Sequence, residues 1–281
     1  SIFDFKQTML GQEGKGWFDH ALPTADELKE SIFQAHERAD CIGVLSTIIE
    51  NHDEPRGVSH YIAEGPVNDT SKKALGTIQI LRKGIPFIYQ GQEIGMENQV
   101  FESVEDFDDI ATINGYHVAK EAGLSEEEAL AAIAKYSRDN ARTPMQWSAE
   151  PGLGFSDGTA WLISPKPNVA INVEDQEKDP NSILNYYRQL TALYRHPLYG
   201  NTVRFGDMIP AYRDRENIIA FERRGDKRLL VISNFQNRQA TLELPATIKT
   251  VILNNTAGLF QEGNQVLELT PYQTLVLELV E

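Results

Sequence analysis

The feature that most constrains the fold is a single change in the pattern of apolar residues near residue 203. Before that point, short apolar runs at residues 2–5, 42–49 and 85–89 alternate with segments whose apolar residues recur at helical spacing. Continuously apolar strands separated by helices are typical of a parallel sheet that is covered on both faces. Three such units are too few to close a barrel of eight strands, so the sequence predicts the C-terminal part of a (β/α)8 TIM barrel.

Helix signals occupy the spaces between these strands. Thr24, followed three residues later by Glu27, gives a capping-box pattern before a segment with apolar residues at helical spacing. Pro197 is expected to end the last helix of this part, because proline cannot continue a helix. The other predicted helices cover residues 71–82, 125–136 and 182–195.

Two long segments do not show a clear period. Residues 97–124 are acidic and are expected to be irregular, and residues 140–180 are rich in Pro, Gly and Asn. Long ordered loops of this kind usually carry function. The aromatic residues Tyr89 and Trp147 could stack on a ligand, but burial is the favoured interpretation.

From about residue 205, short strands with alternating apolar residues are separated by turns such as Arg224-Gly225-Asp226. This pattern is typical of an antiparallel β-sandwich. We therefore predict a partial barrel at residues 1–203 and a C-terminal all-β sandwich domain at residues 204–281. The predicted strands cover residues 218–222, 229–234, 241–244, 250–253, 266–269 and 274–279.

Composition excludes several classes of function. The 41 acidic residues outnumber the 26 basic ones and give a net charge of -15, which argues against a nucleic-acid partner. No stretch approaches the roughly 18 apolar residues of a membrane helix, which argues against a membrane partner. The single cysteine, Cys41, offers neither an intrachain disulfide nor a zinc site and is expected to be a small buried apolar residue.

The best candidates for chemistry directly follow the second predicted strand, in the sequence Asn51-His52-Asp53. In a parallel barrel, residues just past the C-terminal ends of the strands face the active site. A carboxylate there can stabilise a developing oxocarbenium ion, and an imidazole can donate a hydrogen bond to a sugar hydroxyl. From spacing alone, a turn capped by Asn51 is an equally good interpretation.

Three motifs resemble those of the α-amylase superfamily of glycoside hydrolases. Residues 51–56 (NHDEPR) are similar to a signature that follows the seventh barrel strand, and residues 84–96 (GIPFIYQGQEIGM) resemble the eighth strand and its loop. Residues 137–147 (SRDNARTPMQW) resemble a motif of the oligo-1,6-glucosidase branch, which also contains dextran glucosidases, trehalose-6-phosphate hydrolases and sucrose isomerases. The resemblance covers essentially the whole chain.

This resemblance implies roles for three residues. Asp53 matches the carboxylate that stabilises the transition state, and His52 matches the histidine that binds sugar hydroxyls in the first glucose subsite. Arg142 matches an arginine that holds the terminal glucose and restricts the pocket to exo-action, since a guanidinium can bind a carboxylate and a hydroxyl together. Arg138 is expected to form a structural salt bridge.

The resemblance also implies that the chain is the C-terminal half of the enzyme. Residues 2–5 match the sixth barrel strand, whereas the family's nucleophile and acid/base carboxylates follow the fourth and fifth strands. A retaining glycosidase needs both carboxylates, about 5–5.5 Å apart. We therefore expect them upstream of residue 1 and expect the 281-residue chain alone to be inactive. No cofactor and no metal is implied.

The implied function is that of an exo-acting retaining α-glucosidase that removes α-1,6-linked glucose from the non-reducing ends of isomalto-oligosaccharides. The alternatives within the family are a trehalose-6-phosphate hydrolase, for which Lys15 is the one cation we can name near the pocket mouth, and a sucrose isomerase. We expect an oligosaccharide as the partner, and a cytoplasmic bacterial protein that is monomeric at full length.

Alternatives from other classes are a non-catalytic carbohydrate-binding fragment and an accessory subunit of an amino-acid transporter. Two carboxylates on the preceding strands would exclude the first, and the intact Asn51-His52-Asp53 disfavours the second. The sequence departs from many relatives at Glu54, where they have Gln, and at Gln92, where they have Glu. The acidic loop at residues 105–109 could shape the aglycone subsites, but a solvated face is the favoured interpretation.

Overall fold

The computed structural model describes residues 2–40, 42–162, 166–256 and 265–280, so the expectation for Cys41 lies outside the described residues. A parallel sheet of order β1 (Ile2–Phe3), β2 (Leu45–Thr47) and β3 (Ile85–Pro86) begins the fold, as predicted. Each strand is shorter than the apolar run that predicted it. Beyond β2, the run continues as Ile48 and Ile49, which are buried although they lie outside the hydrogen-bonded ladder.

A capping box begins the first long helix, as predicted. In α1 (Ala25–Ala39), the Thr24 hydroxyl accepts from the backbone N–H of Glu27 at 3.2 Å, and the Glu27 carboxylate accepts from the backbone N–H of Thr24 at 2.7 Å. Ser125 makes the same motif at the start of α5 (Glu126–Tyr136). These side chains bind backbone donors that have no partner within the helix.

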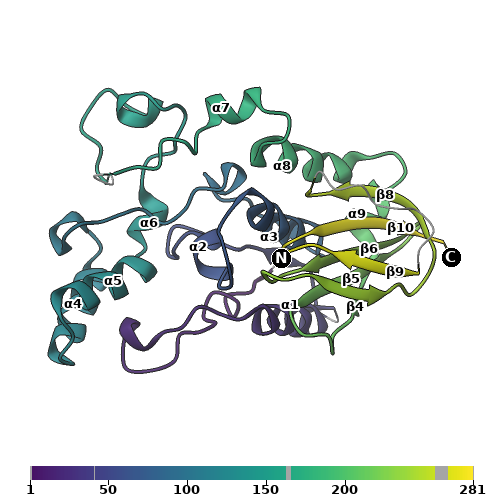
Figure 1. The fold of residues 1–281 in the computed structure, drawn as a ribbon, viewed down its shortest axis with the longest axis horizontal. Coiled ribbons are helices and arrows are strands. Elements are labelled where there is room, and N and C mark those ends of the chain that lie inside the picture. The colour runs from purple at the N-terminus through teal and green to yellow at the C-terminus, as the bar shows by residue number, and fades with distance from the viewer. Residues whose placement is uncertain (1, 41, 163–165, 257–264, 281) are drawn as a thin grey trace.

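Helix α3 (Asp69–Leu81) lies near the centre of the molecule, beside the β-strands of the C-terminal part, which it contacts (Figure 1). It packs on α8 (Ile183–Ala192), where the Thr77 and Tyr186 hydroxyls are 2.8 Å apart. The predicted helix at residues 182–195 ends as a 3-10 turn, η5 (Leu193–Arg195), before α9 (Gly200–Phe205).

Residues 97–124 are not irregular throughout, because they contain α4 (Ile110–Glu121), which packs on α5. Asp109 caps this helix by accepting from the backbone N–H of Thr112 at 3.1 Å. Thr112 and Ala119 are the buried residues of α4. The sequence therefore lacks the apolar stripe by which a helix is usually predicted.

Shorter helical segments complete this part of the chain. Those after α4 lie within or beside the segment at residues 140–180 that was predicted to be a loop. They are α2 (Gly57–Tyr61), α6 (Asp139–Arg142), α7 (Val173–Lys178), η1 (Trp17–Asp19), η2 (Gln92–Ile94), η3 (Val104–Asp106) and η4 (Pro151–Gly154).

The C-terminal part is an antiparallel sandwich. A five-stranded sheet of order β4-β5-β6-β10-β8 packs on a pair formed by β7 and β9. As predicted, none of the described residues from 207 to 280 is helical. The strands are β4 (Asp207–Ala211), which was not predicted, β5 (Ile218–Arg224), β6 (Arg228–Asn234), β7 (Ala240–Glu243), β8 (Ile248–Asn254), β9 (Val266–Leu269) and β10 (Thr274–Leu279).

The five-stranded sheet is covered on both faces. On β5, Ile219 and Phe221 pack with the helices, whereas Ile218 and Ala220 pack against the β7–β9 pair. Successive side chains of a strand point to opposite faces, so a strand covered on both sides is apolar throughout. The prediction of alternating strands is therefore wrong for β5, β6 and β10, whose buried residues are nearly continuous.

Buried polar contacts also join the two parts of the fold. Arg223, on β5, is only 1% exposed and donates to the backbone carbonyls of Leu81 at 2.7 Å and Gly206 at 2.8 Å. The first of these carbonyls belongs to the last residue of α3. The predicted domain boundary at residue 203 falls inside α9 and stays a prediction.

The shared core makes a stability prediction. Phe221→Ala should lower the free energy of unfolding by about 3–5 kcal/mol, because it leaves a cavity between the sheet and the helices. Phe205→Ala, at a side chain that is 70% exposed, should cost less than about 1 kcal/mol. Urea unfolding followed by circular dichroism measures both, and equal losses would contradict this view of the core.

Candidate active site

His52 and Asp53 lie in the turn that follows β2, with the side chains 71% and 52% exposed. The backbone N–H of Asp53 donates to the Asn51 side-chain oxygen at 2.7 Å, which fixes the turn. His52 Nε2 lies 3.2 Å from Asp53 Oδ2. Asn51 therefore braces the turn, as one interpretation of this motif predicts, and the turn exposes the imidazole and the carboxylate, whose functional roles stay predictions.

Two arginines contact the same carboxylate from α6 and the residue before it. Arg142 Nη2 is 3.2 Å and Arg138 Nη1 is 3.4 Å from Asp53 Oδ1, and Arg142 Nε donates to the His52 carbonyl at 3.0 Å. The structure thus brings together the three residues to which the sequence assigned roles, and their roles stay predictions. Arg138, expected to be structural, shares in the contact with Asp53.

Two further aspartates, which the sequence did not identify, hold these arginines. Asp109 Oδ1 accepts from Arg138 Nε at 3.1 Å and also contacts Nη2. Arg142 Nη1 lies 3.6 Å from Asp139 Oδ1 and 3.8 Å from Asp109 Oδ1. The position of Asp139 between two arginines in the SRDNAR sequence was the available signal for it.

Asp109 departs from the expected solvated face of the acidic loop, since it is only 4% exposed, whereas Glu105 and Asp108 of the same loop are exposed. Burial by itself would raise the pKa of the Asp109 carboxyl, but hydrogen bonds from Arg138 and Thr112 outweigh it and hold the pKa below its usual value. Asp139 is fully buried, and its Oδ2 accepts from the backbone N–H groups of Asp108 and Asp109, each at 2.9 Å. These contacts fix the loop against α6.

Arg56 lies beneath this layer and is fully buried. Its guanidinium donates to the Gln90 carbonyl at 2.7 Å and to the Asn140 carbonyl at 3.3 Å, and its Nη1 lies 3.6 Å from Glu50 Oε1. One side chain thus connects the segments that follow β2 and β3 with α6. Tyr89, half-buried, lies against the same guanidinium and donates its hydroxyl to the Ala141 carbonyl.

Two glutamates near Asp53 have pKa values near neutrality. Burial raises the pKa of Glu50 to about 7, although Arg56 and the backbone N–H of Gly57 oppose the shift. Burial also raises the pKa of Glu54 to about 7, with a smaller opposing effect from a hydrogen bond to Thr8. Both carboxyls therefore change their charge within the range in which enzymes usually work.

A cavity of about 320 Å³ opens beside Asp53. Its polar lining is Glu50, Asn51, His52 and Asp53, and aromatic rings on the neighbouring segments form its apolar side. Those rings belong to Phe3, Phe5, Phe87 and Tyr89. A small apolar pocket with a few convergent polar groups is the usual form of a ligand site.

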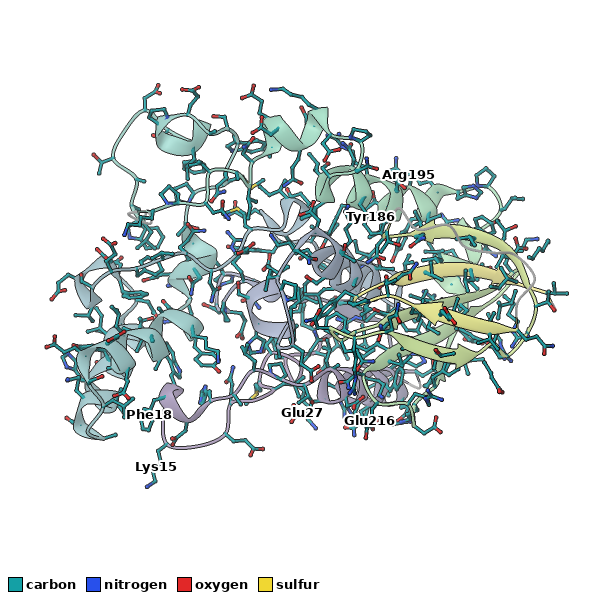
Figure 2. All side chains as sticks on the ribbon, in the orientation of Figure 1. Lys15, Phe18, Glu27, Tyr186, Arg195 and Glu216 are labelled. Atoms are coloured by element: carbon teal, nitrogen blue, oxygen red, sulfur yellow. The ribbon has the colours of Figure 1, made fainter. Side chains whose placement is uncertain are left out.

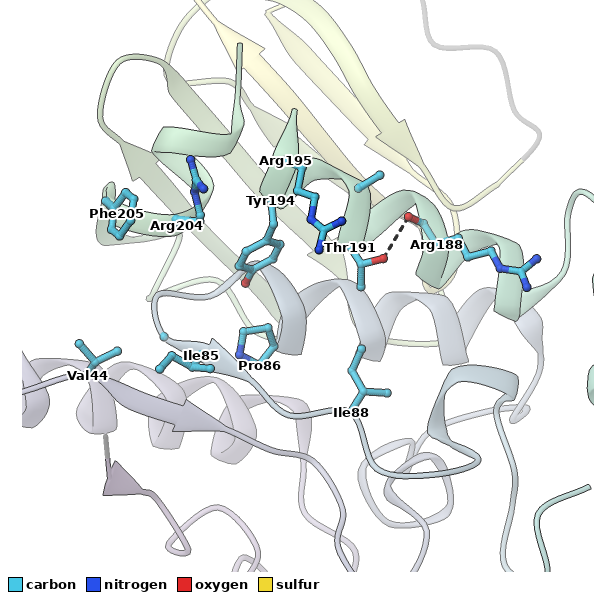
Figure 3. A pocket seen from close by; sticks show the side chains of 12 residues that line it. Val44, Ile85, Pro86, Ile88, Arg188, Thr191, Tyr194, Arg195, Arg204 and Phe205 are labelled. Atoms are coloured by element: carbon cyan, nitrogen blue, oxygen red, sulfur yellow. Dashed lines mark hydrogen bonds between the residues drawn. The ribbon is translucent and has the colours of Figure 1, made fainter. Parts of the chain in front are cut away.

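A larger cavity, of about 940 Å³, lies between β3 and α8 (Figure 3). Tyr194, Pro86, Ile88 and three arginines are among the residues that line it. None of its lining residues carries a carboxylate. Acid–base or nucleophilic chemistry on a sugar needs a carboxylate. We therefore assign the candidate active site to the smaller cavity.

Other features of the described residues bear on what the site can hold. No group of three or more His, Cys, Asp or Glu side chains among them is arranged to bind a metal ion. No helix in the same residues is long and apolar enough to cross a membrane. Trp147, expected to be buried, is 50% exposed.

Comparison with known proteins gives a consistent result for both parts of the chain. Residues 1–198 match the family model of the α-amylase catalytic domain, and residues 218–276 match that of the C-terminal domain of α-amylase SusG. These matches, with the solved structure below, confirm the predicted fold class, the C-terminal part of a TIM barrel followed by an antiparallel β-domain.

Three individual proteins illustrate the similarity. A probable oligo-1,6-glucosidase of Bacillus subtilis is 37% identical over 87% of this chain and 44% of its own length. The trehalose-6-phosphate hydrolase of the same organism is 35% identical over 82% and 42%. The crystal structure of isomaltulose synthase from Klebsiella sp. LX3 matches with a TM-score of 0.90 at 30% identity, over 99% of this chain and 50% of the synthase. The chain thus spans about half the length of the relatives it matches.

Glu50 makes a prediction for the pH dependence of stability. Its folded-state pKa is raised from 4.5 to about 7, so its contribution to stability is fully present below about pH 4.5 and is lost as the pH rises through about 7. Glu50→Gln should remove up to about 3 kcal/mol of this loss between pH 5 and 8. Denaturant unfolding across that range measures it. Glu126→Gln, at the exposed start of α5, is the control, and parallel curves for wild type and Glu50→Gln would contradict the assignment.

Proposed function

Because the chain belongs to the α-amylase family, we propose that the protein carrying it is an exo-acting retaining α-glucosidase that hydrolyses α-1,6-linked glucose at the non-reducing ends of isomalto-oligosaccharides. The observation that carries this proposal is the position of Asp53 at the edge of a pocket, between an exposed imidazole and two arginines. The similarity to a probable oligo-1,6-glucosidase supports the α-1,6 preference.

Asp53 is suited to stabilise positive charge. One of its oxygens receives both arginines at 3.2 and 3.4 Å, and the side chain is still 52% exposed, so part of the carboxylate faces the pocket. A fixed carboxylate beside a developing oxocarbenium ion stabilises the transition state more than the ground state. Asp53 therefore acts on the chemical step.

His52 and Arg142 are suited to position the sugar. His52 has an exposed ring held 3.2 Å from Asp53, so it can donate to a hydroxyl of the glucose in the pocket. Arg142 is anchored to the His52 carbonyl and to Asp53, which orients its guanidinium toward the same place. Orienting the terminal glucose in this way restricts productive binding to chain ends.

The nucleophile and the acid/base carboxylate belong, in this proposal, to the segment that relatives possess and this chain does not cover. The matched relatives are about twice as long as the aligned chain, which leaves room for them. We propose that the complete protein acts in the cytoplasm as a monomer on a neutral oligosaccharide, without nucleic-acid or membrane partners.

Trehalose-6-phosphate hydrolysis is the second candidate, because a trehalose-6-phosphate hydrolase is 35% identical to this chain. A phosphorylated substrate would need cationic side chains at the pocket mouth. Lys15 lies at the tip of the loop before η1 and points outward (Figure 2), and the loop beside the arginines is acidic. These features favour a neutral substrate.

A substrate panel tests the proposal. The complete enzyme should release glucose from isomaltose and isomaltotriose faster than from maltose, and should act poorly on trehalose 6-phosphate and on sucrose. The 281-residue chain alone should release no glucose. Preferred cleavage of trehalose 6-phosphate, or conversion of sucrose to an isomer, would replace the proposed activity with one of the alternatives.

Asp53→Asn should lower kcat of the complete enzyme about a thousandfold or more, a loss of roughly 4 kcal/mol of transition-state stabilisation, with a modest change in KM. The amide keeps the shape of the side chain but cannot balance positive charge. Steady-state kinetics on isomaltose measure it. A variant whose loss appears mainly in KM would assign Asp53 to binding instead.

Arg142→Ala should lower kcat/KM largely through KM, because the arginine contacts the terminal glucose before and during the reaction. Its contacts with Asp53 and the His52 carbonyl predict an additional, smaller fall in kcat, since both groups lose an anchor. Arg188→Ala, on an exposed part of α8 away from Asp53, is the control and should change neither constant. An unchanged KM for Arg142→Ala would count against direct contact with the sugar.

A further inference from the structure

A second feature that suits a sugar lies on the outer side of the arginines, on the loop that runs from Trp147 to Leu162. This loop is anchored by leucines that are almost fully buried, Leu153 and Leu162, each 4% exposed. Its aromatic residues are exposed, and Trp161 is the most exposed of them, at 68%. Buried residues of a loop can hold a neighbouring aromatic ring at the surface, where a ligand can contact it.

The ring of Trp161 is also fixed in orientation. Its indole N–H donates to Asp108 Oδ2 at 2.7 Å, and Asp108 is itself held because its backbone N–H donates to the buried Asp139 carboxylate at 2.9 Å. A ring that is already immobilised loses little conformational entropy when a ligand stacks on it. The polar edge of the indole is thus bound to the protein, and its apolar face remains open.

The support of Trp161 connects it to the candidate active site. Asp108 is followed by Asp109, which binds Arg138, and Arg138 lies 3.4 Å from Asp53 Oδ1. Asp139, which holds the Asp108 backbone, lies in the same helix as Arg142. The Trp161 ring and the Asp53 carboxylate are therefore linked through one network of hydrogen bonds and ion pairs.

The chemistry around the ring selects the kind of ligand. Asp108 is exposed, so its carboxylate can accept hydrogen bonds from hydroxyl groups while it holds the indole. The surrounding segment is acidic at Glu102, Glu105 and Asp106, and Lys166 is paired with Glu102. An anionic ligand would be repelled here, whereas a neutral sugar presents an apolar ring face to Trp161 and hydroxyls to Asp108.

We propose that Trp161 and Asp108 form an outer subsite that binds a neutral glucosyl unit of the leaving part of the substrate. This inference rests on the proposed glucosidase function for its substrate class, α-1,6-linked glucose. The subsite gives the protein a preference for isomaltotriose and longer chains over phosphorylated disaccharides. The residue that determines this preference, Trp161, lies in the loop that follows α6 rather than in the pocket beside Asp53.

Binding can be measured on the 281-residue chain without any hydrolysis. The chain has three tryptophans, so a ¹⁵N-labelled sample gives three indole N–H signals, and Trp161→Phe identifies the one that belongs to Trp161. Isomaltotriose should shift this signal, trehalose 6-phosphate should not, and the signal of Trp17 should stay in place. A Trp161 signal that does not move with isomaltotriose, or that moves equally with trehalose 6-phosphate, would overturn the proposal.

Kinetics on the complete enzyme give the second measurement. Trp161→Ala should raise KM for isomaltotriose about tenfold, equivalent to roughly 1.4 kcal/mol, and should leave kcat nearly unchanged. Trp147→Phe is the matched control, because Trp147 is also half-exposed on this loop, and it should leave both constants unchanged. Equal effects of the two variants, or no effect of Trp161→Ala on KM, would overturn the subsite.

The outcomes also separate this inference from the proposed function. If isomaltotriose shifts the Trp161 signal but the complete enzyme does not cleave α-1,6 bonds, the sugar site stands and the proposed activity fails. If the enzyme cleaves isomaltose and Trp161→Ala changes neither KM nor the binding of isomaltotriose, the activity stands and the subsite is wrong.

Discussion

The arrangement of the site depends on the buried guanidinium of Arg56. It donates to carbonyl groups of two segments that are distant in sequence, at Gln90 and Asn140, and lies near the buried carboxyl of Glu50. A buried arginine is costly unless its donors are bound, so the three segments must meet at this point for the charge to be tolerated. The turn that carries Asp53 and the helix that carries Arg142 are consequently held at a fixed separation.

Above Arg56, the arginines and aspartates form a layer whose charges are arranged asymmetrically. Asp109 and Asp139 are buried, whereas Asp53, which contacts the same arginines, is half-exposed at the edge of a pocket. The buried carboxylates fix the guanidinium groups and leave the exposed one free to interact with a ligand. This division leaves one carboxylate of a largely structural group of charges exposed, as the proposed role of Asp53 requires, and the same group is linked through Asp108 to Trp161.

Local signals were sufficient for some elements and not for others. The capping box at Thr24 predicted the start of α1, because such a motif acts within one turn of helix. Helix α4 could not be predicted, since it buries little of its own surface and is supported by packing on α5. The strands β5, β6 and β10 were predicted as alternating, because no local pattern reveals that helices cover one of their faces and β7 and β9 the other.

The sequence by itself determined the order of the elements, the parallel sheet followed by the antiparallel sandwich, and the family to which the motifs at residues 51–56 and 137–147 belong. It also nominated His52, Asp53 and Arg142, since short motifs carry residue type and spacing. Only the tertiary structure decided that Asp109 and Asp139 hold the arginines, that Glu50 and Glu54 are buried enough to have pKa values near 7, and that Trp161 is fixed by Asp108. These properties depend on contacts between residues far apart in the chain and on the exclusion of water, which no local pattern in the sequence records.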